Sequence, residues 1–589
     1  MDLGSLTPGE IMTHGLANLA SNFSEPAYAA RHGNKAARDF RPAKGSPVDE
    51  KDFFEKSFPT LFPYGEGGFY RHRQTFIAFG DHVKWALQYA DSRFRVHETF
   101  PFVAFGITRK QQALAAARIQ IRTQKFQKDT EILRTLTVDK LRQAAKEEDT
   151  QTPVTDPAVN LLKTHVRATM GHVTGSDQSR YQVRSQIWST TMCKGPPSLW
   201  VTINPSDLHD PIAQVFAGED IDLDHFTKLM GPDSHQRAQN ISKDPFAASE
   251  FFHFTIKTIL ETLFQIQTTK FQIKRKKGVL GEVEAYFGMK EVQGRGTIHL
   301  HILIWLKNTP SPDQLTFLLR SEEFREKIRR YIAHNVRAYL PGMENPESVK
   351  KIPTARDVSY TRPPHPASLT YTAEVQDLER KLACAEQIHG CKIRRCLVMD
   401  KNGQYKCKRR APFECSPDDY VLESGVCGPK RLHPFVNAWN PAILVNARCN
   451  NDIKFLTNGN DTKNIAYYIT MYATKKQGKT YNYSALMADT FAYHIQHPNP
   501  SYTDDIRLDH LSLLFRLGHA VNCRQELAAT LVMTYLMGRT ESVRSHNYSP
   551  IYWSNFIAHL LSRKDEIASL ARQDIESEVH RTENGALDG

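Results

Sequence analysis

The sequence predicts an α+β protein with a central antiparallel sheet, flanking helices, a helical N-terminal region and a cysteine-rich basic insertion. Three observations predict this class. Apolar residues recur at helical spacing through 111–124. Two β-type runs, 279–287 and 297–306, flank the turn residues Gln293-Gly-Arg-Gly296, which indicates an antiparallel hairpin. Cysteines and basic residues crowd the segment 384–427, which has few aliphatic residues for a core of its own.

The composition excludes several classes of protein. The chain has 589 residues, 40% hydrophobic and 24% charged, which argues against disordered and fibrous proteins. No run approaches the roughly 18 apolar residues of a membrane span, and the start of the chain has no signal-peptide pattern, so we expect neither a membrane partner nor secretion. Lys and Arg number 76 against 64 Asp and Glu, and the formal charge of +12 favours a polyanionic partner.

Changes in composition divide the chain into six segments. These are a mobile leader at 1–50, a mostly helical region at 51–195, the sheet with its histidine hairpin at 196–380, the Cys-rich basic insertion at 381–435, a tyrosine-bearing helix and C-terminal helices at 436–560, and a polar tail at 561–589.

The elements follow from local signals. A further helix is predicted at 129–145. Leu199–Ile203 predicts a short strand, which stops before Pro205 because proline cannot extend a β-ladder. Helical spacing returns at 247–267. Three more helices are predicted after the insertion, at about 463–476, 509–520 and 525–537.

Two histidines on the second strand of the hairpin are candidate metal ligands. Period-two alternation places His299 and His301 on one face, about 6 to 7 Å apart at Cα, and the aliphatic residues of 298–306 on the other. Glu291 and Gln293, toward the end of the first strand, offer oxygen ligands nearby. The alternative is a pair of ordinary surface or core histidines, since a chain with 24 histidines contains roughly one such pair by chance.

The predicted helix at 463–476 carries Tyr468, Tyr472 and Lys475 at i, i+4 and i+7, so two phenols and an ammonium share one face. A tyrosine can attack phosphorus, and a nearby cation would stabilise the charge that develops on the phosphate. Aromatic residues at this spacing are also ordinary core residues, so the pattern alone does not decide between the two.

The cysteine-rich segment offers a second ligand set. His389, Cys391, Cys396 and Cys407 could hold a structural Zn²⁺, with Cys415 as a spare ligand, although the spacing lacks paired Cys-x-x-Cys motifs and unligated thiols remain the alternative. Basic residues that could contact phosphates occur here and in an earlier run; they are Lys274, Arg275, Lys276, Lys277, Arg394, Arg395, Lys408, Arg409 and Arg410.

The order of these motifs resembles a known family. The strand ending in Thr202-Ile-Asn-Pro205, the His299-Leu-His301 pair and the Tyr468–Lys475 motif follow one another as in the HUH endonucleases that initiate rolling-circle replication. The two tyrosines, the segment Phe58–Gly67 and the cysteine insertion look like the Rep portion of Helitron transposases, the Helitron helicase-like domain. The similarity runs from about Phe53 to Trp553.

The resemblance implies a fold and a reaction. It implies a five-stranded HUH-type antiparallel sheet and a nickase and strand transferase that acts on single-stranded DNA at transposon ends, in the nucleus. Mg²⁺ or Mn²⁺ would be held by His299, His301 and a third ligand, for which the family pattern favours Gln293 over Glu291. Tyr468 or Tyr472 would form a 5′-phosphotyrosine, the second tyrosine would take the other transfer, and Lys475 would balance charge.

One expected part of a full-length Helitron transposase is missing from the pattern. No phosphate-binding loop of the Gly-x4-Gly-Lys-Ser/Thr type is found, and Gly478-Lys-Thr480 lacks the first glycine because Ala473 stands there. We therefore expect the helicase to be supplied by another domain or by a protein in trans. A co-opted relative that binds DNA without cutting it is the alternative, and a zinc hydrolase built on the histidine pair ranks third.

Overall fold

The computed structural model describes residues 53–71, 73–269, 271–293, 296–353, 357–393, 396–456, 467, 470, 481–498, 506–549, 553–564 and 566. The described residues up to Ser545 form one compact unit, and those from His546 onward form a second. Within these ranges, no helix combines the length and apolar character needed to cross a membrane.

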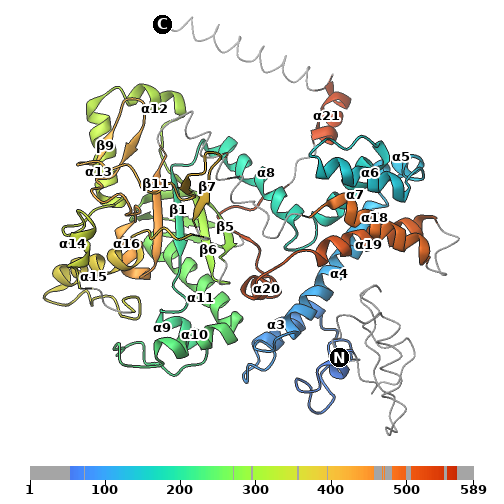
Figure 1. Cartoon of the computed structure of the whole chain (residues 1–589), viewed down its shortest axis with the longest axis horizontal. Coiled ribbons are helices and arrows are strands. Elements are labelled where there is room, and N and C mark those ends of the chain that lie inside the picture. The colour runs from blue at the N-terminus through green and yellow to red at the C-terminus, as the bar shows by residue number, and fades with distance from the viewer. Residues whose placement is uncertain are drawn as a thin grey trace, which may run out of the picture. The chain divides into compact units, whose positions relative to one another are not determined.

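The first unit is a mixture of helices and antiparallel strands (Figure 1). Its main sheet has the strand order β11-β1-β6-β5-β12, every neighbouring pair is antiparallel, and β4 adds to the start of β5. The bounds are β1 Leu199–Asn204, β4 Lys277–Gly278, β5 Gly281–Val292, β6 Ile298–Leu306, β11 Asn450–Phe455 and β12 Ser542–Arg544. Three small pairs lie outside it, namely β2 Ile266–Thr268 with β3 Ile273–Arg275, β7 Leu397–Met399 with β8 Tyr405–Cys407, and β9 Tyr420–Val421 with β10 Cys427–Gly428.

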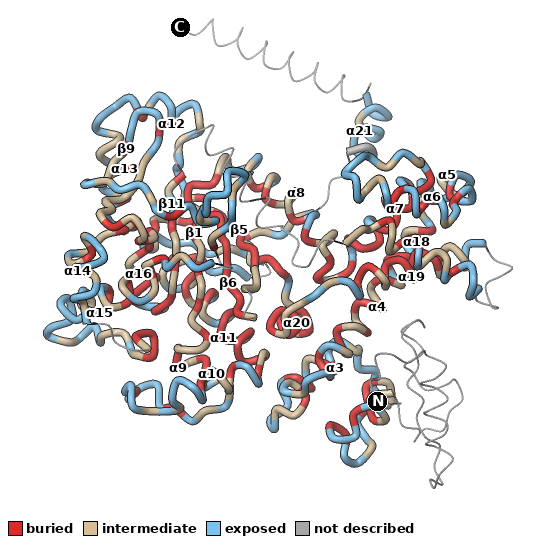
Figure 2. The backbone as a smooth tube through the Cα atoms, in the orientation of Figure 1, coloured by how far each residue is buried: buried red, intermediate tan, exposed pale blue. Residues whose placement is uncertain are grey.

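Helices cover one face of this sheet. Alternate residues of β1 and β6, including Val201, Leu300 and Ile302, form one apolar core with Phe252 of α11 and Ile332 of α13. Figure 2 shows the strands of the sheet as largely buried. The helices that precede and follow β1 to β6 are α8 Asp177–Lys194, α9 Pro211–Phe216, α10 Ser234–Lys243, α11 Pro245–Thr258, α12 Pro312–Leu318, α13 Glu322–Asn335, α14 Pro346–Lys350, α15 Tyr371–Glu386 and α16 Pro441–Ala447.

The remaining helices of the first unit form two further cores, each assembled from both ends of the chain. Ala113 of α4 and Leu162 of α7 pack with Leu514 of α19, while Phe54 and Phe100 pack with Leu531 of α20. The bounds are α2 Phe53–Ser57, α3 Phe79–Leu87, α4 Phe100–Gln120, α5 Gln124–Leu133, α6 Val138–Asp149, α7 Pro157–Met170, α18 Tyr483–Gln496, α19 Ile506–Cys523 and α20 Ala529–Leu536.

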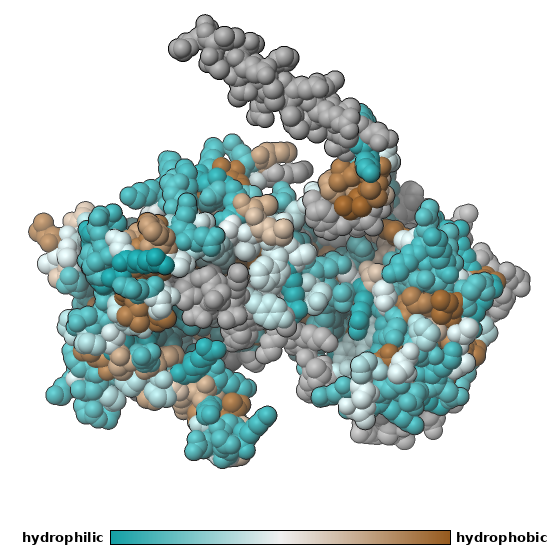
Figure 3. Space-filling model, turned by 90° about the horizontal axis from the view of Figure 1, so that it is seen from above, coloured by the Kyte–Doolittle hydropathy of each residue, from teal (hydrophilic) through white to brown (hydrophobic). Residues whose placement is uncertain are grey.

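The second unit contains one described helix, α21 (Trp553–Ser562). Its apolar side chains Phe556, Ile557 and Leu561 are exposed. Figure 3 shows a brown, hydrophobic surface at this helix.

Several predicted elements differ in extent from the structure. The helix expected at 129–145 is two helices, α5 and α6, because the Thr137 side chain caps a new N-terminus by accepting a hydrogen bond from the Lys140 N–H. The helix expected at 247–267 ends early in a π-helical turn at Ile259–Leu263. The hairpin, the strand at 199–203 and the last two helices are confirmed. The leader at 1–50 lies outside the described residues, as does most of 463–476.

Candidate metal centres

The antiparallel register of β5 and β6 builds the first cluster. Glu291 lies opposite His299, and Met289 lies opposite His301. Ile298, Leu300, Ile302 and Ile304 point into the main core, which confirms the predicted alternation along β6.

The ligand atoms of this first cluster form a nearly equilateral triangle. The two His Nε2 atoms lie 3.1 Å apart. Glu291 Oε2 lies 3.2 Å from His299 Nε2 and 3.1 Å from His301 Nε2. The side chains are 9% exposed for both histidines and 24% for the glutamate, so water competes weakly for these atoms.

Hydrogen bonds alone satisfy this triangle poorly. If both imidazoles donate Nε2–H to the carboxylate, two N–H donors lie 3.1 Å apart with no acceptor between them. If instead one imidazole donates its Nε2–H to the Nε2 of the other, neither Nε2 has a proton to donate to the carboxylate. A cation among the three atoms would accept all three lone pairs at once, and the residues therefore fit a metal ion.

The electrostatics favour the metal-binding forms of two of the three donors. Burial raises the pKa of Glu291, but hydrogen bonds from His299 and His301 outweigh it and hold that pKa well below the ordinary value. Burial lowers the pKa of His299, an effect that Glu291 partly offsets and that the charges of His301 and Arg409 reinforce. The carboxylate is thus ionised and His299 is neutral near pH 7, which are the forms that bind a cation.

The edges of the triangle can be compared with the donor spacing of two common metal geometries. In an octahedral Mg²⁺ site with ligand distances of about 2.1 Å, neighbouring donors lie about 3.0 Å apart. In a tetrahedral Zn²⁺ site with distances of about 2.0–2.1 Å, they lie about 3.3–3.4 Å apart. The edges of 3.1, 3.1 and 3.2 Å fall between these two values, and a set of three donors leaves further positions for water or substrate in either geometry.

Strand β1 supplies the support of this cluster, which the sequence alone did not reveal. Thr202 lies opposite His301, and its Oγ1 is 3.0 Å from His301 Nδ1. With Nδ1–H donating to this hydroxyl, Nε2 presents its lone pair to the metal. Trp200 lies beside His301, with ring centroids 6.2 Å apart, and the ammonium of Lys454 lies 5.1 Å from the Trp200 ring centroid.

The other predicted third ligand, Gln293, lies just beyond the end of β5. Its backbone N–H donates to Thr297 O across the turn. The structure brings the carboxylate of Glu291, rather than a residue of the turn, into contact with both imidazoles. The geometry therefore favours Glu291 over Gln293 as the third ligand.

The second cluster consists of His389, Cys391, Cys396 and Cys407, whose ligand atoms all lie within 4.8 Å of one another. Cys396 immediately precedes β7 and Cys407 ends β8, and the hairpin turn between these strands is held by Asp400 Oδ1, which accepts from the Asn402 and Gln404 N–H groups. The His389 N–H donates to Phe435 O, which fixes the other ligand segment.

Sulfur chemistry makes this second set suitable for a metal. Burial raises the pKa of Cys391 to about 11, reinforced by the neighbouring Cys407 and Cys396. Burial also opposes ionisation of Cys407, but the N–H groups of Ala411 and Arg409 donate to its sulfur and bring that pKa below the ordinary value. Thiolates this close together repel one another unless a cation lies between them. Three sulfurs and one imidazole are a ligand set typical of a tetrahedral Zn²⁺ site. The residues fit Zn²⁺, while the geometry alone does not identify the metal.

The remaining predicted residues are dispersed. Cys415 is exposed, and its thiol faces the backbone oxygen of Leu432 rather than the four-ligand cluster. Lys274, Arg275, Lys276 and Lys277 are exposed on and between β3, which pairs with β2, and β4, which pairs with the start of β5. That end of β5 lies about 30 Å along the strand from Glu291. Lys408, Arg409 and Arg410 are exposed directly after Cys407. Tyr468, Tyr472, Lys475, Arg394 and Arg395 lie outside the described residues.

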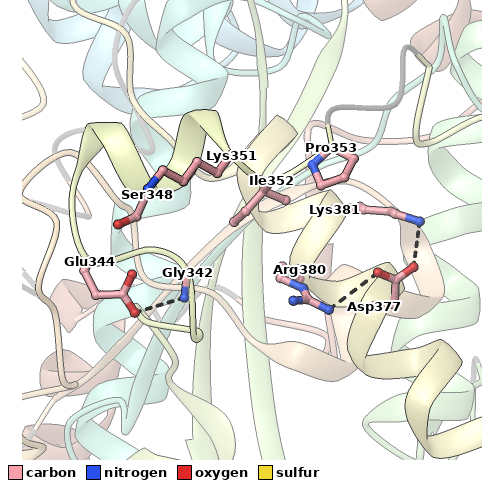
Figure 4. Close-up of a pocket in the computed structure, with 9 residues that line it drawn as sticks. All are labelled: Gly342, Glu344, Ser348, Lys351, Ile352, Pro353, Asp377, Arg380 and Lys381. Carbon is pink, nitrogen blue, oxygen red and sulfur yellow. Dashed lines mark hydrogen bonds and ion pairs between the residues drawn. The ribbon is translucent and has the colours of Figure 1, made fainter.

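A separate pocket lies between α14 and α15 (Figure 4). Its wall includes Asp377, which forms ion pairs with Lys381 at 2.6 Å and Arg380 at 3.6 Å. The other lining residues are Gly342, Glu344, Ser348, Lys351, Ile352 and Pro353. None of them belongs to either metal cluster.

Fold and site together define an α+β protein with a candidate metal centre of two histidines and one carboxylate on an antiparallel sheet. Residues 82–304 match the family model described as the Helitron helicase-like domain at the N-terminus. The match is less than half of the chain, contains all three residues of the first cluster and ends before the second. No curated protein matches the chain. The match supports a relationship to Helitrons and indicates a transposon-associated function.

Proposed function

We propose that the protein is a metal-dependent nickase and strand transferase for single-stranded DNA at the ends of a rolling-circle, Helitron-type transposon. The observation that carries the proposal is the triangle of Glu291, His299 and His301 on the sheet, within the segment that matches the Helitron model. The antiparallel sheet is consistent with an HUH endonuclease, and the net charge of +12 suits a nucleic acid.

The protein's residues divide the work of the reaction. Glu291, His299 and His301 hold Mg²⁺ or Mn²⁺, which when bound would polarise the scissile phosphodiester and orient it for in-line attack. Thr202 fixes the ring of His301. Trp200 beside His301 and the ammonium of Lys454 over the Trp200 ring would place an aromatic ring and a cation next to the DNA at the metal.

The nucleophile comes from the tyrosine motif identified in the sequence. The phenol oxygen of Tyr468 or Tyr472 forms a bond to phosphorus, the bond to the 3′-oxygen breaks, and the phenol proton is transferred overall to that oxygen. The products are a 5′-phosphotyrosine and a free 3′-OH, and no ATP is consumed because the ester bond is conserved. The second tyrosine performs the other transfer, Lys475 balances charge at the phosphate, and a helicase acts with this protein in the nucleus.

The test is a covalent-capture assay. Purified protein is incubated with a 3′-labelled single-stranded oligonucleotide pool containing element ends, with Mn²⁺ or Mg²⁺, and analysed on a denaturing gel. We expect label to travel with the protein and to be lost with EDTA, with His299→Ala and with the Tyr468→Phe/Tyr472→Phe double variant.

The way in which this assay fails would distinguish the nickase from a DNA-binding protein and from a nuclease. A pool that binds but is never cleaved with either ion would contradict the nickase and favour a co-opted DNA-binding protein. Cleavage that persists in the double tyrosine variant would instead indicate hydrolysis by metal-bound water, and would replace strand transfer with a nuclease reaction.

A further inference from the structure

Residues 396–410, which we name the basic hairpin, contain two ligands of the second cluster at their base. The Lys408 N–H donates to Cys396 O at 2.7 Å, and the Arg409 N–H donates to the Cys407 sulfur. The structure describes every residue of this hairpin, and Cys396 is the only buried one. Because the hairpin has no apolar core of its own, a metal in the cluster would be what fixes its two strands at the base.

The basic hairpin carries more positive charge than its own acidic residue can neutralise. Its charged residues are the cations Lys401, Lys406, Lys408, Arg409 and Arg410 and one carboxylate, Asp400. Lys406 pairs with Asp400 at 2.8 Å, and the four remaining cations have no ion-pair partner among the described residues. A Zn²⁺ bound by three thiolates and a neutral imidazole has one net negative charge, so it offsets only one of these four cations.

Cations on an ordinary solvated helix of this chain are arranged differently. Every Lys and Arg of α13 pairs with a glutamate of the same helix. The basic hairpin is exposed to the same extent but has no comparable set of acids. Its excess charge therefore favours a partner with several phosphates close together.

An exposed aromatic ring lies among these cations. Tyr405 of β8 lies opposite Met399 of β7, so both side chains are on one face, and they are 55% and 61% exposed. An exposed ring beside cations suits a single-stranded nucleic acid, because the ring can stack on a base of any sequence while the cations contact the backbone. In a duplex the bases are already stacked on one another. The surface therefore favours a single strand over a duplex.

We propose that Zn²⁺ in the second cluster makes the basic hairpin a binding site for single-stranded DNA, separate from the histidine centre. Tyr405 stacks on a base, and the four remaining cations contact neighbouring phosphates. The choice of DNA as the polyanion rests on the proposed function. The inference adds a second place where the protein holds the strand, and this place needs zinc but neither Mg²⁺ nor Mn²⁺.

The first test measures binding of an eight-nucleotide oligo-dT to the full chain by fluorescence anisotropy, at several salt concentrations and without added Mg²⁺ or Mn²⁺. Lys408→Gln/Arg409→Gln should weaken binding about 20-fold at about 0.1 M salt. The slope of log affinity against log salt should become shallower by about 1.4, the value expected for two lost phosphate contacts.

The matched control is Lys327→Gln/Arg330→Gln on α13, which removes the same charge from a surface with acidic partners. It should change the affinity less than about twofold. Equal losses in the two double variants would show that only the net charge of the protein matters, and would overturn the proposal.

The second test concerns the aromatic ring. Tyr405→Leu should weaken oligo-dT binding at least about fivefold, whereas Tyr405→Phe keeps the ring and should stay within about twofold of the wild type. Neither variant should change binding of a 16-base-pair duplex, taken as about the length that a protein can contact, by more than about twofold. An unchanged affinity for oligo-dT in Tyr405→Leu, or an equal loss for the duplex, would overturn the stacking role.

The zinc dependence is tested on the wild type, which should contain about one equivalent of zinc when purified. Removing the zinc with a chelator should lower the affinity for oligo-dT to that of Lys408→Gln/Arg409→Gln or below, and adding Zn²⁺ but not Mg²⁺ should restore it. Zinc-free protein that keeps the full affinity would overturn the role of the metal. The glutamine and Tyr405 variants retain all four ligands, so they test the DNA-binding surface even if the zinc-free chain unfolds.

Failure of this inference and failure of the proposed function are distinguishable. A wild type that binds oligo-dT through the basic hairpin but never cleaves would contradict the nickase and leave the hairpin site standing. A wild type that cleaves, with hairpin variants that bind oligo-dT as tightly as it does, would contradict the hairpin site alone.

Discussion

The two candidate metal centres differ in which elements hold their ligands and in how many ligands they offer. The first takes three nitrogen and oxygen donors from adjacent strands of the main sheet. The second takes three sulfurs and one nitrogen from a small hairpin and the loop before it. A three-donor site leaves coordination positions open for substrate, whereas a four-donor sulfur site is closed.

This difference implies different roles for the two sites: the first would serve the reaction and the second would stabilise the fold. The strands fix Glu291, His299 and His301 through backbone pairing, so that the ligands keep their places when the metal leaves. The segment around Cys391 and Cys407 has few aliphatic residues, so a metal would have to replace the missing core. We therefore expect loss of the first metal to cost activity and loss of the second to cost folded structure.

The largest effect is expected for Glu291→Gln, which removes the only negative charge from the three-donor set. Metal-dependent cleavage should fall at least about 1,000-fold, while the thermal midpoint stays within about 2 °C, because a buried carboxylate is replaced by an amide of equal size. The measurement pairs single-turnover kinetics with thermal unfolding. Glu282→Gln, at the half-buried start of the same strand, where the carboxylate pairs with Lys307, is the matched control. An equal loss of cleavage in this control would show that cleavage does not depend on the three-donor set.

A large effect on stability, rather than on cleavage, is expected for Cys396→Ser. Zinc content should drop to background and the free energy of unfolding should fall by roughly 3–5 kcal/mol, since the site loses a thiolate and the hairpin loses its cross-link. Metal analysis and denaturant unfolding measure both. Cys523→Ser, an exposed cysteine of α19, should change neither quantity; zinc retained in Cys396→Ser would show that the cluster is not a metal site.

A moderate effect is expected for Thr202→Val. The variant keeps the shape of the side chain but removes the hydroxyl 3.0 Å from His301 Nδ1, so Mn²⁺ affinity should fall about 10- to 100-fold. Thr202→Ser restores the hydroxyl and should restore most of the affinity. Titration of Mn²⁺ by electron paramagnetic resonance checks this, and an unchanged affinity in Thr202→Val would show that the hydroxyl does not orient the ring.

The smallest effect concerns pH. Because burial lowers the pKa of His299 below its ordinary 6.5, the neutral form that binds metal persists as the pH falls through 6.5. Mn²⁺ affinity should therefore change less than about threefold between pH 7.5 and 6.5 and should fall only in more acidic solution. The measurement is the same titration at several pH values. A steep loss starting above pH 6.5 would mean that the imidazole is not shielded.

The sequence predicted the histidine pair because the pattern is local. Alternation of His299 and His301 with aliphatic residues, and the turn before Thr297, suffice to place both imidazoles on one face. The second cluster was likewise predicted as a set of four from its chemistry, without its geometry.

Contacts that depend on long-range pairing could not be predicted. The choice between Glu291 and Gln293 turns on where β5 ends and on its register with His299. The contact of Thr202 with His301 depends on the pairing of β1 with β6, which are about a hundred positions apart in the sequence. By contrast, Thr137 is a local capping signal inside the 129–145 pattern that could have divided that helix in advance.

The strand order has a practical consequence for expressing parts of this protein. Both outer strands of the sheet, β11 and β12, come from the last third of the chain, after the segment that matches the Helitron model. A fragment ending at residue 304 would leave β1 and β5 as edge strands. Their unpaired N–H and C=O groups could then form hydrogen bonds with strands of other chains. Such a fragment should aggregate, so soluble expression requires that the chain continue at least through Ser545.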